Sequence, residues 1–431
     1  SSHLASQVVS PGIERPCSGP DSCALATMLT GKTLLTASAV LSTSVCTAIL
    51  EKERLELERP VETAFHTFMQ TYGRSYENGS REYHERLALF AKWVSEVEAQ
   101  NAKPERLWTA DINALSDRTE AELSQLRGWR GVATRGASST RRNGAFLSQR
   151  GNLPSECMNW TSLRAAKHVT DQGSCGSCWA VSSIKVLETH LEIHRPGSKR
   201  TFSAQELVSC VPNPHQCGGT GGCEGATMEL AFHWAMNRGL AQEKDTPYKA
   251  ITGRCKKSVS DPTVQLFEDD ALEEITKPGV HLAQPGAPGL QFGMLGWERL
   301  PENGYEALLR ATAEHGPVGV SVSARSWSLY SKGIFNGCEK DAVIDHAVVL
   351  IGFGKDKKTG VPFYLVQNSW GPGWGEHGKI RLLRSDNDGE HCGVDRQPEV
   401  GTGCAGGPKE VKVCGMCGIL YDASIPHFVR L

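Results

Sequence analysis

The sequence predicts an α+β protein with a cleft between a helical part and a β-rich part. Apolar residues recur at helical spacing across residues 179–191, and a second helix is expected over about 228–237. Further along the chain, residues 318–322, 347–353 and 362–366 are β-rich, and a charged turn joins the last two as a hairpin. Because the helices precede the strands instead of alternating with them, an α+β class is favoured over a parallel α/β class.

Composition sets the first bounds on organisation and partners. The chain has 431 residues, enough for two or three domains, with 22% charged and 39% hydrophobic residues, which is typical of globular proteins. A net charge of −2 gives no indication of a nucleic acid partner or an anionic membrane. Fifteen cysteines indicate an oxidising compartment, and the odd count leaves at least one sulfur unpaired.

Residues 1–50 are expected to form a leader. A short basic stretch and an apolar run over about 28–48 are typical of a signal peptide, with small residues near Cys46 and Ala48 for cleavage. The alternative is a signal anchor, since the run is about long enough to span a bilayer. Its many Thr and Ser residues favour a cleaved signal. Residues 1–27 receive no role.

Residues 51–127 are charged and helical, and from periodicity alone they predict a solvated helical hairpin. The two apolar stripes that support this are Phe65, Phe68 and Tyr72, followed by Tyr83, Leu87, Phe90, Val94 and Val97. Residues 128–151 then lose periodicity and gather Gly, Ser, Thr and Arg. Such a segment cannot bury a core and is expected to be an exposed linker.

Cys178 is the candidate nucleophile. The helix over 179–191 is expected to begin near Ser177, so Cys178 lies where unpaired N–H groups and the helix dipole favour a thiolate. Gln172 can return its amide over the sulfur, which with the Cys178 backbone N–H gives two donors for an oxyanion. The alternatives are a buried structural cysteine, or a metal-binding or redox pair with Cys175.

A thiol nucleophile needs a base, and His346 is the candidate. It stands at the entrance of a predicted strand, where the backbone holds the ring rigidly. The partner strand ends at Asn368, whose amide oxygen could accept the imidazole N–H and fix its tautomer, while Trp370 shields that bond from water.

Two motifs carry a family resemblance. Residues 175–179 match C-G-[SA]-C-[WY], and residues 368–375 read Asn-Ser-Trp-Gly-Pro-Gly-Trp-Gly, so the chain resembles papain-like cysteine peptidases, specifically the cathepsin L-like enzymes. The resemblance implies a papain-like two-lobed fold, with a helical lobe and a β-barrel-like lobe, preceded by a helical propeptide. The separations from Cys178 to His346 and Asn368 exceed the usual ~130–150 residues, which an insertion near 261–298 accounts for.

The segment before the linker resembles the family's inhibitory propeptide. The positions that carry this resemblance are Glu82, Arg86, Phe90, Trp93, Val97 and Asn101, followed by Asp111, Asn113, Leu115 and Asp117. The resemblance therefore implies a zymogen, with an inhibitory propeptide over 51–127, a processing linker over 128–151 and a peptidase domain over 152–431.

The resemblance also implies substrate-binding residues, namely Gly225, Ala226, Met228, Asp345, Trp370 and Asp422. Asp422 would lie at the floor of the pocket for the second side chain before the cut, where it should admit Arg as well as Leu or Phe. Two alternatives remain open. The position is counted five residues after the cysteine that begins the closing strand, so it is Asp422 if that cysteine is Cys417 and Gln397 if it is Cys392. Alternatively, Asp422 could point to solvent.

Disulfides are inferred from the resemblance alone: Cys175 with Cys223, Cys210 with Cys255, and Cys338 with either Cys392 or Cys417. If Cys417 is the partner, residues 393–416 are a second insertion. Four cysteines, Cys157, Cys217, Cys404 and Cys414, receive no partner.

The resemblance implies a cysteine endopeptidase with a Cys178–His346–Asn368 site and a Gln172 oxyanion hole, without cofactor or metal. Expected partners are protein or peptide substrates, the chain's own propeptide and cystatin-like inhibitors, with the enzyme a monomer in a lysosome or vacuole, or secreted. Asn78 and Asn159 fit the glycosylation pattern. The alternatives are a catalytically silent papain-like binding homologue and a zinc module on Cys404, Cys414 and Cys417.

Overall fold

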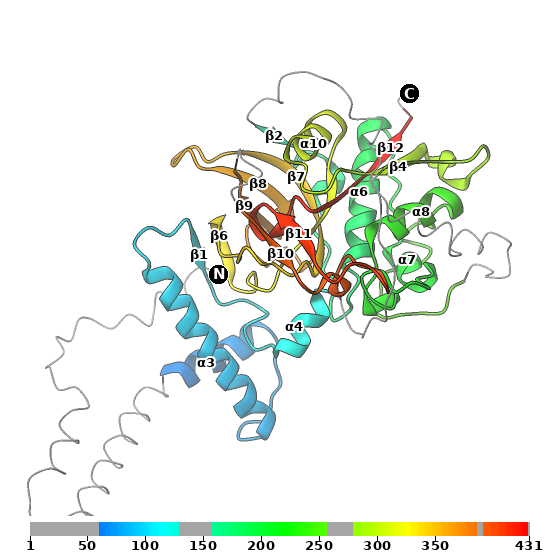
Figure 1. The fold of residues 1–431 in the computed structure, drawn as a ribbon. Helices are drawn as coiled ribbons and strands as arrows, with labels where there is room; N and C mark the ends of the chain where they lie inside the picture. Colours follow the sequence, from blue (N-terminus) through cyan, green and yellow to red (C-terminus); the bar gives the residue numbers. More distant parts are fainter. Residues whose placement is uncertain (1–59, 129–156, 257–278, 386–390, 430–431) are drawn as a thin grey trace, which may run out of the picture. The chain divides into compact units, whose positions relative to one another are not determined.

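A computed structural model describes residues 60–128, 157–256, 279–385 and 391–429 (Figure 1). The chain forms two compact units, residues 1–96 and 97–431, which are described separately. The predicted signal peptide or anchor and the mature start, expected between residues 144 and 153, lie outside the described residues. Within the described part, no helix is both long and apolar enough to cross a membrane.

The first unit is built around stacked aromatic rings. A helix covers residues 60–71, and after a short turn α3 (Arg81–Ala102) begins. The Phe65, Phe68, Tyr83 and Phe90 side chains are buried, and the Phe90 ring lies 5.4 Å from that of Phe65 and 5.1 Å from that of Phe68. Both predicted apolar stripes therefore contribute to one aromatic core, and each buried ring stabilises it by about 1.5–3 kcal/mol.

The second unit holds helices and a large mixed sheet. Its α-helices are α4 (Glu120–Leu126), α5 (Arg164–Lys167), α6 (Cys178–His194), α7 (Ala204–Cys210), α8 (Met228–Arg238) and α10 (Tyr305–Arg310). The strands of the main sheet follow the order β1-β6-β9-β8-β7-β5-β12-β4-β3, with β2 paired to β7, and β10 and β11 form a separate hairpin.

The strands have the following bounds: β1 Trp108–Ala110, β2 Met158–Asn159, β3 Gly279–Leu282, β4 Met294–Arg299, β5 Val318–Val322, β6 Tyr330–Phe335, β7 His346–Lys355, β8 Pro362–Gln367, β9 Lys379–Leu383, β10 Cys392–Asp395, β11 Val411–Cys414 and β12 Asp422–Phe428. The predicted strands correspond to β5, β7 and β8, and β7 and β8 pair as the expected antiparallel hairpin.

Two hydrophobic cores divide this unit into lobes. One contains α6, α7 and α8 and buries Trp179, Leu187 and Phe232. The other lies within the sheet and buries Val348, Val366 and other strand residues. α6 packs against β7, where the Ser182 hydroxyl donates to the Ala347 carbonyl over 2.9 Å. The predicted two-lobed α+β architecture is confirmed.

The first predicted insertion is partly regular structure. Residues 279–299 form the antiparallel hairpin β3–β4, and β4 pairs with β12, so the hairpin extends the main sheet. The expectation of a structureless stretch near 261–298 is wrong for this part. Two of its Pro-Gly pairs, at 285–286 and 288–289, lie in the connection between the two short strands, and Trp297 is fully buried.

Five disulfides join described cysteines. Cys175–Cys223 and Cys210–Cys255 form as expected. Of the two alternatives for Cys338, the structure forms Cys338–Cys417, whereas Cys392 pairs with Cys414, so the pairing of Cys338 with Cys392 is corrected. The fifth bridge is Cys217–Cys404. A zinc module on Cys404, Cys414 and Cys417 is excluded, because all three sulfurs are in disulfides and cannot be thiolates.

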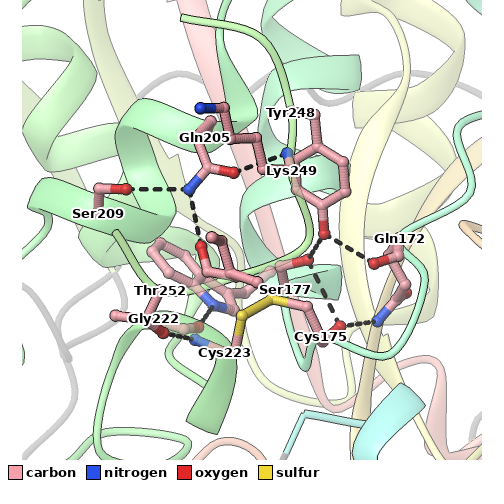
Figure 2. Close-up of a disulfide and its surroundings, with 12 residues drawn as sticks. Gln172, Cys175, Ser177, Gln205, Ser209, Gly222, Cys223, Tyr248, Lys249 and Thr252 are labelled. Atoms are coloured by element: carbon pink, nitrogen blue, oxygen red, sulfur yellow. Dashed lines mark hydrogen bonds between the residues drawn. A yellow bond between two sulfur atoms is a disulfide. The ribbon is translucent and has the colours of Figure 1, made fainter. Parts of the chain in front are cut away.

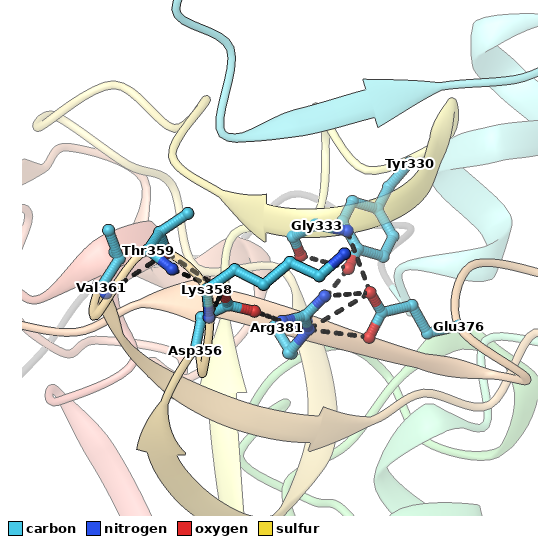
Figure 3. A network of polar contacts seen from close by, with 8 residues as sticks. All are labelled: Tyr330, Gly333, Asp356, Lys358, Thr359, Val361, Glu376 and Arg381. Atoms are coloured by element: carbon cyan, nitrogen blue, oxygen red, sulfur yellow. Dashed lines mark hydrogen bonds and ion pairs between the residues drawn. The ribbon is translucent and has the colours of Figure 1, made fainter.

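Strand β1 comes from the N-terminal segment and pairs with β6 at the edge of the sheet. The β6 edge is held by Arg381 of β9, which forms ion pairs with Glu376 and Asp356 (Figure 3). Glu376 in turn accepts the Gly333 N–H over 2.9 Å. This network fixes the strand on which β1 docks.

Helix caps show where local patterns hold and where they do not. Ser203 followed three residues later by Glu206 is the sequence pattern of a capping box. The Ser203 side chain caps α7, but the box is incomplete, since Glu206 accepts from Trp234 and the Ala241 N–H. A complete capping box occurs instead at Thr119 and Glu122, at the start of α4.

We expect Thr119→Ala to fray α4, because it removes the acceptor for the Glu122 N–H and costs about 1 kcal/mol. Amide hydrogen exchange across 120–126 should accelerate about fivefold. The matched control is Ser124→Ala in the same helix, whose exposed hydroxyl bonds only to Ala121. Equal acceleration in both variants would contradict the capping role.

Candidate active site

The loop that precedes α6 is fixed by a disulfide and by hydrogen bonds around it (Figure 2). The Cys175–Cys223 bridge closes it, and the Gly176 N–H donates to the Cys223 carbonyl over 3.0 Å. The Gln172 side chain donates to the Cys175 carbonyl over 2.9 Å, and the Tyr248 hydroxyl donates to the Gln172 carbonyl over 2.8 Å. These contacts set where α6 begins.

Cys178 is the first residue of α6, with Ser177 as the N-cap, as the sequence predicts. Its side chain is only 4% exposed. Burial raises the pKa of the Cys178 thiol to about 11, although hydrogen bonds from the backbone at Ala347 and Trp179 oppose this rise. In this state Cys178 is therefore a neutral thiol at neutral pH, despite its place at a helix N-terminus.

His346 begins β7, and Asn368 directly follows β8. Because these strands pair, the two side chains meet, with Nε2 of His346 2.8 Å from Oδ1 of Asn368. Oδ1 can only accept, so Nε2 carries the proton and Nδ1 is the free basic nitrogen. Nδ1 is buried and has no hydrogen-bond partner within the described residues. The Trp370 ring lies 5.1 Å from the imidazole and covers it.

The pKa of His346 is lowered to about 4, mainly by burial. Its hydrogen bond to Asn368 opposes this shift, while the nearby Arg127 cation adds to it. Since the pKa of Cys178 is raised and that of His346 is lowered, the pair is held in its uncharged form in this structure.

One small cavity joins residues that are far apart in the sequence. Cys178 and His346 both line it, together with Asp345, Ala226 and Met228 of the predicted set. Asn368 and Trp370 do not line it but contact His346, and Gln172 contacts the segment beside Cys178. Gly225 and Asp422 of the predicted set do not line the cavity either.

The segment that follows α4 closes this cavity, because Arg127 and Gly128 also line it. After α4, the Leu126 carbonyl accepts a 3.0 Å hydrogen bond from Nε2 of Gln172, and the Cys178 sulfur lies 4.0 Å from the Arg127 carbonyl. A peptide carbonyl thus already binds the Gln172 amide predicted to serve an oxyanion.

Two glycines permit this close approach. Gly128 has a φ of +93°, and a Cβ added there would lie 3.1 Å from the Cys178 sulfur. Gly225 has a φ of +90°, and a Cβ on it would lie 1.7 Å from the Gly128 carbonyl oxygen. Both positions require glycine for conformation and for space. The main chain at Gly128 thus comes close to that of Gly225, a residue predicted to bind substrate.

Arg127 makes a buried ion pair at the site. Its Nε lies 3.1 Å from Oδ2 of Asp345, and the side chains are only 5% and 3% exposed. Arg127 also contacts Glu120, and Asp345 also pairs with Arg325 at 3.3 Å. Burial raises the pKa of Asp345 to about 6, and the two arginines hold it below what burial alone would give.

Asp422 is buried and does not point to solvent. Oδ1 accepts from Nε of Arg299 at 2.9 Å, and Oδ2 accepts from the Ser321 hydroxyl at 2.6 Å. Ser321 lines the cavity, whereas Asp422 lies behind it. Glu229 is close by, and burial and the Asp422 charge raise its pKa. The alternative position, Gln397, lies on the connection between β10 and β11.

Family models match both parts of the chain. The model described as papain family cysteine protease matches residues 154–284 and 290–402, more than half of the chain. The chain belongs to the papain family of cysteine proteases. The cathepsin propeptide inhibitor domain (I29) model matches residues 65–123. The papain-family chain therefore carries its own inhibitory propeptide, as a zymogen does.

Curated relatives and solved structures are consistent with this family. Vignain of Phaseolus vulgaris is 32% identical over 336 residues, covering 75% of this chain and 82% of the relative. Cathepsin S of Bos taurus is 29% identical over 335 residues, covering 76% and 89%. The recombinant stem bromelain precursor has a TM-score of 0.61 at 26% identity, covering 86% of this chain and 99% of that one. The digestive procathepsin L2 proteinase of Tenebrio molitor also has a TM-score of 0.61 at 26% identity, covering 85% and 100%.

Three charged residues at or near the site were not predicted from the sequence. Arg127 was assigned to the edge of the linker, and Arg299 and Glu229 received no role. A Gly directly after an Arg at the end of a capped helix was the available signal for Arg127 and Gly128. Nothing local indicated that Arg299 would meet Asp422, because the two are joined only by the β4–β12 pairing.

Acid should release the segment around Arg127. Burial raises the pKa of Asp345 to about 6 and the Arg127 cation opposes that rise, so the attraction between the two charges exists while Asp345 is ionised, above about pH 6, and is lost as the pH falls through that value. We expect iodoacetamide to label Cys178 in the zymogen faster as the pH decreases from about 7 to 5. The labelling rates are first corrected for the lower intrinsic reactivity of a thiol at lower pH.

Arg127→Gln should already label about tenfold faster at pH 7, because it removes a charge-assisted contact of ~1.5–3 kcal/mol. The matched control is Arg118→Gln, which removes the partly exposed pair with Glu122. Unchanged labelling of the Arg127 variant would show that this ion pair does not hold the segment.

Proposed function

We propose that this papain-family protease is a cysteine endopeptidase in which Cys178 is the nucleophile, His346 the base, Asn368 the orienting residue and Gln172 an oxyanion donor. The observation that carries the proposal is the cavity lined by both Cys178 and His346, where Gln172 already donates to a peptide carbonyl. A nucleophile, an oriented base and a carbonyl donor at one point are what acyl transfer requires.

Removal of the propeptide is proposed to activate the pair. Water then reaches Cys178 and His346, and the Arg127 cation leaves, so both causes that hold the pair neutral are weakened. The proton can pass from the sulfur to Nδ1 of His346, while Nε2–H stays bonded to Asn368. The helix N-terminus then stabilises the thiolate.

In the acylation step, the sulfur bonds to the scissile carbonyl carbon and the carbonyl oxygen becomes an oxyanion. Nε2–H of Gln172 and the Cys178 backbone N–H stabilise this charge. The C–N bond then breaks, and the leaving amine takes the proton from Nδ1 of His346. In deacylation, water gives a proton to His346 and attacks the thioester, which releases the acid and restores the thiol.

Several finer features remain part of this proposal. The substrates are proteins or peptides, cystatin-like inhibitors are further partners, and the enzyme is a monomer. Residues 128–151 form the processing linker ahead of a domain over 152–431. Five disulfides favour the secretory pathway, with a lysosome or vacuole, or secretion, as the destination.

The pocket for the second side chain before the cut is proposed to be apolar. Ala226, Met228 and Ser321 line the cavity, and the Asp422 carboxylate behind them is already neutralised by Arg299. A substrate Arg would gain little from a carboxylate whose two oxygens are both bonded. The earlier expectation that Asp422 admits Arg is therefore revised in favour of Leu or Phe.

Cys178→Ser in the activated enzyme should lower kcat/KM for peptides at least ~10³-fold, because a serine has no populated anion at neutral pH. The epoxide E-64 should add one inhibitor mass to the wild type and none to this variant. Cys157→Ser is the matched control, since Cys157 also lies outside the five disulfides of the described residues. An enzyme that resists E-64 and cuts no peptide would instead be the silent binding homologue.

The activated wild type should prefer Leu to Arg at the second position before the cut by at least about tenfold in kcat/KM, since a charged side chain meets no free counter-charge there. Arg299→Met combined with Glu229→Gln removes one buried charge of each sign and leaves Asp422 unpaired. In this variant the Leu-to-Arg ratio should fall, and adding Asp422→Asn should restore it. If the Leu-to-Arg ratio of kcat/KM is the same in the wild type and in both variants, Asp422 does not influence the pocket.

A further inference from the structure

The connection between β10 and β11 runs from the β-rich lobe to the helical lobe. We call residues 396–405 the strap. In Figure 1 it is the orange-red loop that extends from the β10–β11 hairpin toward α7. It lies within the predicted second insertion, 393–416, and neither the nucleophile nor its partners explain its presence.

The strap is anchored first on the β-rich lobe. Asp395, fully buried at the end of β10, accepts the Ile344 N–H at 3.0 Å and the Gln397 N–H at 2.7 Å. Arg396 pairs with Asp341 at 2.5 Å. The first residues of the strap are therefore bound to the segment that leads directly into Asp345 and His346.

The second anchor lies on the helical lobe, in the glycine-rich loop that follows α7. The Cys217–Cys404 disulfide joins the two segments covalently. The Gly218 N–H donates to the Gly403 carbonyl at 2.9 Å, and the Ala405 N–H donates to the His215 carbonyl at 2.7 Å. The strap thus links the two lobes by one covalent bond and two backbone hydrogen bonds.

The strap passes from one lobe to the other beside the cavity of the candidate active site. Gly401 and Gly218 both line the cavity that holds Cys178 and His346. A Cβ on Gly401 would lie 2.0 Å from the Ile344 carbonyl oxygen. A Cβ on Gly218 would lie 2.6 Å from the Gly401 carbonyl oxygen and 3.0 Å from that of Ala226. No space for a further chain remains between these backbones, and they meet beside the wall of the second-residue pocket.

We propose that the strap ends the substrate groove at this pocket, so that the enzyme recognises only two residues on the N-terminal side of the cut. The inference rests on the proposed function, which places Ala226 and Met228 in the pocket for the second side chain. Substrate residues further toward the N-terminus must leave the groove, and they add little to binding in the transition state.

A substrate length series tests the strap. Acetyl-Leu-Gly-, acetyl-Ala-Leu-Gly- and acetyl-Ala-Ala-Leu-Gly-aminomethylcoumarin share the same two residues before the cut. For the activated wild type, kcat/KM should change less than about twofold across the series, because remote contacts that are absent cannot contribute to catalysis. Intact mass in the assay buffer verifies that the Cys217–Cys404 bridge survives the reductant.

Cys217→Ser combined with Cys404→Ser opens the tether, and kcat/KM should then rise at least about fivefold from the shortest to the longest substrate. The matched control is Cys392→Ser with Cys414→Ser, which removes a disulfide of the same hairpin that does not cross the cleft, and it should keep the flat wild-type series. If the tether variant does not fold, the wild-type series alone tests whether residues beyond the second before the cut contribute to kcat/KM.

A fivefold or larger rise in the wild type, or the same response in both disulfide variants, would overturn the role of the strap. Such an enzyme would still cut all three substrates in a manner that depends on Cys178. Loss of that dependence, or no cleavage of any substrate, would instead refute the proposed function.

Discussion

The packing of α6 against β7 is the constraint on which the site depends. Cys178 begins the helix and His346 begins the strand, so their separation is decided by how these two elements meet. The Ser182–Ala347 hydrogen bond and the buried Trp179 and Leu187 side chains hold the interface. A shift of α6 by one turn would move the sulfur by about 5.4 Å, which is enough to separate it from the imidazole.

The zymogen is silenced by the same burial that orders its site. Leu126, Arg127 and Gly128 fill the space above Cys178, and exclusion of water raises the pKa of the thiol while it lowers that of His346. The Arg127 cation strengthens the second effect. Under the proposed function, the propeptide inhibits by closing the cavity and by opposing the charged form of the Cys178–His346 pair, two effects that its release would reverse together.

Two segments outside the short family motifs act on the same region from opposite directions. The β3–β4 hairpin supplies Arg299, which neutralises Asp422 beneath the proposed pocket. The β10–β11 connection supplies the strap, whose Gly401 lines the cavity together with Ala226 and Met228. Specificity in this chain is thus expected to depend on these segments as well as on the family motifs.

The α+β class and the order of the main elements could be predicted from the sequence, and so could the candidate site residues Cys178, His346, Asn368 and Gln172. These follow from local signals, because helical spacing, strand alternation and short motifs are properties of neighbouring residues. The start of α6 at Cys178 and the bounds of β5 were predictable for this reason.

Features that depend on contacts between distant segments could not be predicted from the sequence. Whether Cys338 pairs with Cys392 or Cys417, and whether Asp422 is free or bonded to Arg299, depends on strand pairing between distant segments. Glu206 shows the same limit, since its local capping role is replaced by contacts with Trp234 and Ala241. A side chain takes the partner that the assembled fold brings within hydrogen-bonding distance, and no local pattern records that partner.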